Sequence, residues 1–253
     1  AELRKQLLER TTIAGDEPVP VIFDELLVSG EQPGPGLWRV SRVVGEREHV
    51  LWILGNYGPL PRRMQWRTEG VERVIARSQE VLGPAEVDAG VGVWSRIALL
   101  PSLVGIRDNP DGRRLEEIVP APLYARWLDL KARYLGDRRN VERWRPLFAA
   151  GELYEEAIEA AGLERNNRVW PAVEKAARRH GVAVSRPTVK VPIEKPRQIA
   201  REFKQAELDD LECFAKTVER LESDLDLMRV RANAWAVGDL RTLERFAPVD
   251  QFG

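Results

Sequence analysis

The sequence predicts an α/β protein with a central mixed sheet, opened by a β-hairpin and surrounded by many helices, including one long C-terminal helix. Three observations support this fold class. The segments Leu37–Ser41 and Val50–Gly55 have strand-like patterns and are joined by a short turn. Helical spacing dominates after Pro120, and apolar residues recur every three or four positions over residues 208–235.

Composition indicates a folded globular protein. Its length fits one large domain or two small ones, and the lack of a linker favours a single domain over residues 1–253. Hydrophobic residues make up 43% of the chain and charged residues 31%, which is ordinary for a folded protein. We see no internal repeat and no low-complexity linker, and no apolar run is long enough to span a membrane. The net charge is −1 and arginine pairs are scattered among acidic residues, which argues against a nucleic-acid partner.

The hairpin follows a proline- and glycine-rich break at residues 32–36. Leu37–Ser41 alternates apolar and polar residues, as a half-buried strand does, and Val43–Glu48 supplies the turn. The run from His49 to Gly55 is almost continuously apolar, which is typical of a strand buried on both faces. We therefore expect Val50–Gly55 to be a central strand, hydrogen-bonded on both sides, with Leu37–Ser41 as its antiparallel neighbour.

A loop at Asn56–Arg63 leads to a helix expected from Thr68 to Val81, with Thr68 as its N-cap. Val81–Val87 has strand character that Gly83-Pro84 interrupts. Val93–Ile106 is apolar and fits either a strand or a helix.

The second half of the chain is mainly helical. A first helix is predicted after Pro120 from the spacing of Tyr124, Trp127, Leu128, Lys131 and Leu135. A helical stretch over Arg139–Ala161 should break at Pro146, which is suited to the first turn of a helix. Trp170–His180 is predicted to be a short helix, and the proline-interrupted segment Val182–Ile193 an edge strand or two short strands.

The long C-terminal helix is predicted from one apolar face, made of Leu208, Leu211, Phe214, Val218, Leu221, Leu225, Met228, Ala232 and Trp235. A helix of this length spans roughly 45 Å. Gly238 should end it and Asp239 should cap a following turn. Its apolar face either packs on the core, which we favour, or forms a homodimer through residues 208–235. Alanine and tryptophan are poor seam residues for a coiled coil.

Few residues suggest a catalytic or metal-binding site. His49 opens a strand and His180 ends a helix, where an imidazolium complements the helix dipole, so both are interpreted as structural. The single cysteine, Cys213, is a small buried hydrophobe or, in an exported protein, a thiol whose partner is missing. No common metal, calcium or dinucleotide motif is present, so no metal or other cofactor is predicted. A carboxylate pair brought together by folding stays an open alternative.

Two segments resemble the TraB/GumN family, relatives of the Tiki metalloproteases. Gly36-Leu37-Trp38-Arg39-Val40-Ser41 and Val50-Leu51-Trp52-Ile53-Leu54-Gly55-Asn56-Tyr57-Gly58-Pro59-Leu60-Pro61 resemble the family's opening hairpin and its following loop. Leu221–Trp235, followed by Gly238-Asp239-Leu240, is similar to the family's long helix and its ending. The resemblance implies a bacterial protein of the cell envelope, periplasmic or secreted. Ala1 at the chain start fits a removed signal peptide or a trimmed chain.

The departures from the family pattern affect the expected chemistry. The family places the histidine of a Gly-x-x-His motif and a carboxylate of the next strand on a divalent metal. Here the motif reads Gly55-Asn56-Tyr57-Gly58, and the carboxylate position falls near Gly83-Pro84. The resemblance therefore implies a cleft without its metal ligands, whose candidate binding residues are Gly55, Asn56, Tyr57, Gly58, Glu80 and Glu86.

We expect from this a binding or structural role rather than an enzyme, that is, a pseudoenzyme. The alternative is a protease-like hydrolase that uses other polar residues of the same cleft. The family's second Gly-x-x-His and its closing strands lie beyond Gly253, so we also expect the domain to lack its C-terminal strands, with a partner for Cys213 among them. The sequence predicts no particular substrate or partner.

Overall fold

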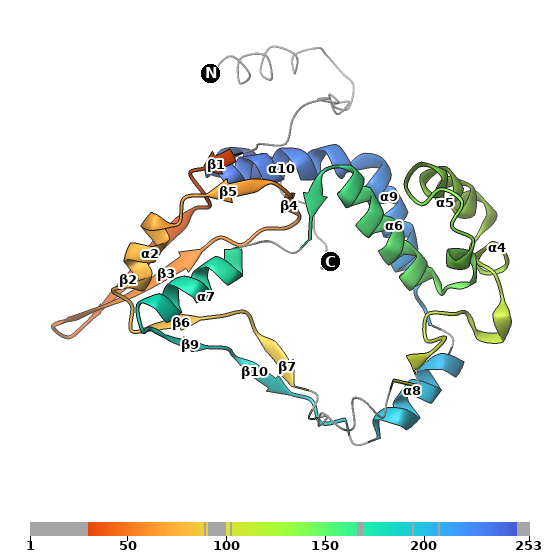
Figure 1. The fold of residues 1–253 in the computed structure, drawn as a ribbon, viewed down its shortest axis with the longest axis horizontal. Helices are drawn as coiled ribbons and strands as arrows, with labels where there is room; N and C mark the ends of the chain where they lie inside the picture. Colours follow the sequence, from red (N-terminus) through yellow and green to blue (C-terminus); the bar gives the residue numbers. More distant parts are fainter. Residues whose placement is uncertain are drawn as a thin grey trace, which may run out of the picture.

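The computed structural model describes residues 30–88, 90, 100–101, 103–165, 169–193, 195–206 and 208–246. Within these ranges it confirms a mixed α/β protein. The strands lie in one part of the molecule, together with the helices at residues 69–75 and 169–179, and the helices at residues 115–134 lie in another, as Figure 1 shows. Most of the ambiguous segment Val93–Ile106 lies outside the described residues.

The predicted hairpin is confirmed. Strands β2 (Leu37–Val44) and β3 (Arg47–Leu54) pair antiparallel, from Leu37 opposite Leu54 to Val44 opposite Arg47. The turn contains Gly45 at a φ of 64°, which favours glycine because it has no Cβ. Trp38 covers the base of the hairpin, where a Cβ atom at Gly55 would lie 2.9 Å from its ring.

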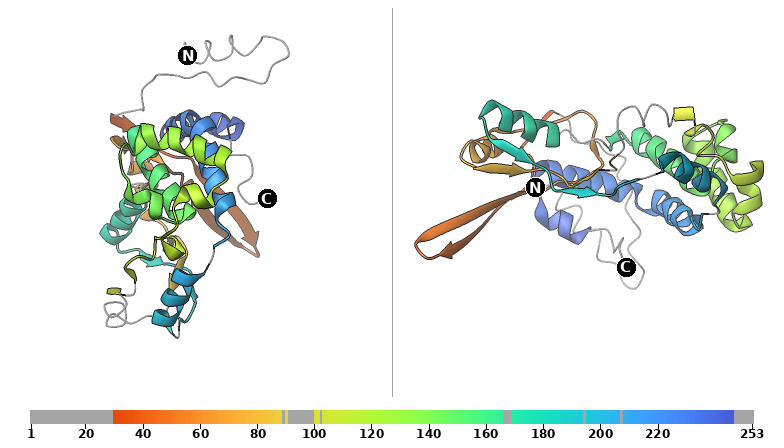
Figure 2. Two further views of the ribbon diagram at one scale, coloured as in Figure 1. Left: turned by 90° about the vertical axis from the view of Figure 1, so that its right-hand side faces the viewer. Right: turned by 90° about the horizontal axis from the view of Figure 1, so that it is seen from below.

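The central position expected for Val50–Gly55 is wrong. Among the described strands, β3 pairs with β2 alone, and Leu51 and Ile53 are 53% and 46% exposed. The prediction failed because an apolar run is typical of buried strands, whereas this hairpin projects from the body of the protein (Figure 2). Only its base reaches a core, through Leu54.

The expected central mixed sheet is replaced, in the described part of the chain, by five two-stranded sheets. Besides the hairpin, they are β1 (Gly30–Gln32) with β5 (Met64–Trp66), β4 (Leu60–Pro61) with β8 (Leu163–Glu164), β6 (Glu80–Leu82) with β9 (Ala183–Ser185), and β7 (Glu86–Asp88) with β10 (Thr188–Lys190). Val182–Ile193 thus forms two short strands, one of the two predicted forms. Gly83-Pro84 separates β6 from β7, and the ring of Trp170 occupies the space beside Gly83 that a Cβ atom would need.

Helix α2 (Glu69–Ile75) begins after Thr68, as predicted, but ends before the expected Val81. Its last turn tightens, since the amide of Arg77 bonds the carbonyl of Val74, and the Thr68 side chain makes no capping hydrogen bond. Helix α7 (Val169–Arg179) packs on α2, and the buried residues of their shared core are Ile75, Val173, Ala176 and Ala177.

The helix-rich part contains α4 (Leu115–Ile118), α5 (Ala121–Tyr134), α6 (Pro146–Ala160), α8 (Pro196–Gln205) and α9 (Leu211–Ser223), with 3-10 turns η1 (Pro110–Gly112) and η2 (Asn140–Arg143). Pro146 occupies the first turn of α6, as predicted. Helices α5, α6 and α9 share a core of large apolar residues, among them Trp127, Leu153, Phe214 and Val218.

The single long helix is wrong. The chain forms α9 and α10 (Leu225–Val237) with a break at Asp224, and Leu208 lies before α9. The hydroxyl of Ser223 bonds the carbonyl of Glu219, which is a known cause of helix bending. Gly238 ends α10 in the left-handed conformation, and Asp239 caps α11 (Leu240–Arg245) through the amide of Thr242, both as predicted.

The apolar face proposed for a homodimer packs against other segments of the same chain. Phe214, Val218 and Leu221 lie in the α5–α6–α9 core, and Met228, Ala232 and Trp235 lie in a second core with Leu60 and Leu163. Helix α10 thereby connects the helical part to the loop that follows the hairpin. This loop holds four of the six predicted site residues.

Candidate functional site

The loop Gly55–Gly58 is anchored on α10 through its backbone. The amide of Gly55 donates to the carbonyl of Gly36 at 3.1 Å, which closes the base of the hairpin. The indole Nε1 of Trp235 donates to the carbonyl oxygen of Gly55 at 3.1 Å. Trp235 is buried, so this contact fixes where β3 ends relative to α10.

Tyr57 meets a buried arginine. The Nε atom of Arg231 donates to the Tyr57 hydroxyl at 2.8 Å, and Arg231 is only 2% exposed. The other guanidinium nitrogens donate to the carbonyl of Phe246 at 3.0 Å and to Oδ2 of Asp224 at 2.5 Å. Burial lowers the pKa of Arg231, but the hydrogen bond and the charge of Asp224 outweigh that effect, so the pKa is raised. The guanidinium therefore stays charged and has an acceptor at each nitrogen.

The two acidic candidates lie elsewhere. Glu80 on β6 accepts a hydrogen bond from the hydroxyl of Ser185, and Glu86 on β7 pairs with Arg186. Arg186 also bonds Glu174 at 3.0 Å and lies over the Trp170 ring. Figure 1 shows β6 and β7 beside β9 and β10, away from β4 and α10. The structure therefore divides the six predicted residues between two places.

The residues at the family's motif position do not fit a divalent metal. Gly58 has no side chain, and Asn56 is exposed on the loop. The Tyr57 oxygen lies beside the Arg231 cation, which would repel a metal ion. Among the residues that the structure describes, no group of three or more His, Cys, Asp or Glu side chains could hold a metal ion.

The two histidines also have ordinary surroundings. His180 Nε2 lies 3.0 Å from Oε1 of Glu72, beside the Arg179–Glu72 ion pair, which is consistent with a structural role at the end of α7. His49 lies on the exposed hairpin. Cys213 is exposed on α9, which contradicts one of its two predicted interpretations, that of a buried hydrophobe.

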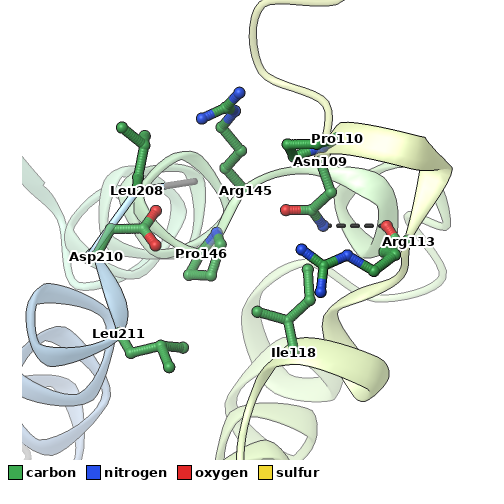
Figure 3. A pocket seen from close by; sticks show the side chains of 9 residues that line it. All are labelled: Asn109, Pro110, Arg113, Ile118, Arg145, Pro146, Leu208, Asp210 and Leu211. Carbon is green, nitrogen blue, oxygen red and sulfur yellow. Dashed lines mark hydrogen bonds between the residues drawn. The ribbon is translucent and has the colours of Figure 1, made fainter. Parts of the chain in front are cut away.

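A cavity of about 200 Å³ lies in the helical part, and sequence reasoning missed it (Figure 3). Three segments that are separate in the sequence meet there, so no local motif indicates the cavity. Its lining residues are Asn109, Pro110, Arg113, Ile118, Arg145, Pro146, Leu208, Asp210 and Leu211.

Two charged residues of this cavity, Arg145 and Asp210, hold helix ends. Arg145 is buried and donates to the carbonyls of Phe203, Lys204 and Ala206 at 2.7–2.9 Å, which are among the last acceptors of α8. Burial lowers the pKa of Arg145, and the charge of Asp210 opposes that effect. Asp210 accepts from the Leu147 amide at 2.8 Å and so caps α6. The chemistry of these side chains is therefore structural.

The fold and the site define a mixed α/β protein in which a glycine- and tyrosine-containing loop is fixed to a C-terminal helix. The chain belongs to the TraB/PrgY/gumN family, which it matches over residues 36–252. No curated protein and no solved structure matches it. Within the described ranges, every helix is too short or too polar to cross a lipid bilayer.

Proposed function

We propose that this family member acts as a binding or structural protein of the bacterial cell envelope, periplasmic or secreted, without the metal centre implied for its relatives. The observation that carries the proposal is Gly58 at the position of the family's histidine. A glycine has only its carbonyl to offer, which is a poor ligand for a transition metal.

The contacts around the loop support the same conclusion. The hydroxyl of Tyr57 accepts from Arg231, and the carbonyl of Gly55 accepts from Trp235. Both candidate carboxylates, Glu80 and Glu86, are engaged by Ser185 and Arg186. A hydrolase would need its acid and base within reach of one substrate, whereas Glu80 and Glu86 lie on β6 and β7, away from the loop.

Metal content tests the proposal. We expect purified protein to contain no stoichiometric transition metal, and its melting temperature to be unchanged by a chelator. A chelator-induced drop in melting temperature that manganese or zinc reverses would overturn the proposal.

A hydrolysis assay tests the alternative function, a protease-like hydrolase. We expect no cleavage of unstructured polypeptide substrates by the wild type above the level of a buffer control. Cleavage that disappears in Glu80→Gln or Glu86→Gln, while the fold is retained, would favour the protease-like hydrolase.

Cell fractionation tests the location, because a protein found only in the cytosol of its native host contradicts an envelope role.

A further inference from the structure

Both faces of the β2–β3 hairpin carry exposed apolar side chains, and one of them also carries a surplus of cationic side chains. Residues opposite each other in an antiparallel pair lie on the same face, and faces alternate along each strand. The register therefore assigns one face, here called the basic face, to Trp38, Val40, Arg42, Val44, Arg47, His49, Leu51 and Ile53.

The two faces of the hairpin differ in net charge. Arg42, Arg47 and His49 lie toward the tip of the basic face, which contains no acidic residue. Glu48, the single acid of the two strands, lies on the opposite face and pairs with Arg39 at 2.6 Å. The basic face is thus a positive surface, and both arginines on it are exposed.

The apolar residues of the basic face are also exposed. Val40, Leu51 and Ile53 are 50%, 53% and 46% accessible, and Trp38 presents part of its indole beside them. Exposed apolar side chains that lie together on one surface are a feature of interaction sites. The hairpin projects beyond the helices, as the right-hand view of Figure 2 shows, so a flat surface can approach it.

We propose that the basic face of the hairpin docks on an anionic lipid bilayer. Cationic side chains attract the phosphates of the headgroups, and a tryptophan with aliphatic neighbours favours the boundary between headgroups and acyl chains. Among the described strands the outer edges of β2 and β3 are open. Unpaired backbone groups do not enter hydrocarbon, so the hairpin stays at headgroup depth.

This occupant agrees with the charge pattern better than a second copy does. A second copy laid face to face with its tip in the same direction would bring Arg42 and Arg47 against the same cations. An anionic bilayer instead complements the positive charges on the basic face. Binding to a flat bilayer also needs no pocket of matching shape. The inference is independent of the metal question in the proposed function.

Vesicle flotation tests the proposal with the full chain. We expect binding to vesicles of phosphatidylcholine mixed with phosphatidylglycerol, and no binding to phosphatidylcholine alone. Binding should weaken with added salt, because the attraction is screened. Arg42→Gln and Arg47→Gln should each weaken partitioning about fivefold. Leu51→Ser should also weaken it, because one apolar side chain no longer enters the interface.

The opposite face supplies matched controls. Arg39→Gln removes one positive charge and Val50→Ser one apolar side chain from a hairpin of the same register. Both should bind the mixed vesicles as the wild type does. The proposal is overturned if these controls lose as much binding as Arg42→Gln and Leu51→Ser, or if neutral vesicles bind equally well. It is also overturned if the basic-face variants instead abolish a homodimer, as measured by light scattering.

Discussion

The Nε atom of Arg231 lies 2.8 Å from the hydroxyl oxygen of Tyr57, which precedes it by 174 positions in the sequence. This hydrogen bond joins the family's motif loop to the centre of α10. The same guanidinium also bonds Asp224, where α9 and α10 meet, and the carbonyl of Phe246 after α11. One buried cation thus connects three parts of the chain.

We expect Tyr57→Phe to lower the free energy of unfolding by about 1–3 kcal/mol, because the buried Nε of Arg231 loses its acceptor. Urea unfolding measures the difference. Tyr134→Phe is the matched control, since its ring is half-buried near Arg133 and should tolerate loss of the hydroxyl. Equal losses in the two variants would contradict a specific role for the Tyr57 hydroxyl.

Arg145→Met should lower the free energy of unfolding by at least about 2 kcal/mol, because carbonyls at the end of α8 lose their donor. Hydrogen exchange should show the loss of protection concentrated in α8. Arg143→Met, two positions earlier, removes an exposed arginine and should stay within about 0.5 kcal/mol of the wild type. A uniform change in exchange across the chain would argue against this local anchoring.

Stability should depend on Glu72 at neutral pH and less so in acid. The hydrogen bonds from His180 and then Arg179 lower the pKa of Glu72. A carboxyl whose pKa is lowered by folding stabilises the protein above its unfolded-state pKa, and this stabilisation disappears as pH falls through the folded-state pKa. The difference in melting temperature between wild type and Glu72→Gln should therefore shrink below the ordinary glutamate range. Glu69→Gln, on the same helix, should show no such convergence.

Tyr124 should ionise at a higher pH than an ordinary tyrosine. Burial first, and then the charge and hydrogen bond of Glu142, raise its pKa to about 12. Since the folded-state pKa lies above the unfolded value, the stabilisation from neutral Tyr124 is complete below the unfolded pKa and is lost as pH rises toward 12. A difference titration of phenolate absorbance between wild type and Tyr124→Phe should show this transition. Glu142→Gln should lower the pKa only in part, because burial is the larger cause; a full return to the ordinary value would reverse that ranking.

Cys213 should react with a thiol reagent in the folded protein, because its side chain is exposed on α9. The rate should approach that of the urea-unfolded chain. Labelling that requires denaturant would instead support the buried thiol expected from residue type alone.

Local signals in the sequence predicted much of the fold. The hairpin register follows from a short turn around Gly45 between two strand-like segments. Pro146 begins α6 and Gly238 ends α10, because each residue restricts or permits backbone conformations wherever it occurs. The family resemblance likewise rested on contiguous residues at the hairpin and at the end of α10, and the family match confirms it.

The candidate site was predicted only as a stretch of sequence. Gly55–Gly58 could be recognised from its motif, but nothing nearby indicates that Arg231 and Trp235 would hold it. Glu80 and Glu86 were grouped with the loop by the family pattern, whereas strand pairing with β9 and β10 takes them elsewhere.

The sequence by itself determined the hairpin, several helix ends such as those at Pro146 and Gly238, and the family, because these depend on residues close together in the chain. The tertiary structure alone decided that β3 is exposed, that the helix breaks at Asp224, and that Arg145 and Asp210 are buried at helix ends. Periodicity indicates which face of an element is apolar, but not which distant segment covers it. Burial and hydrogen-bond partners depend on contacts between residues tens to hundreds of positions apart, so they are fixed only when the chain has folded.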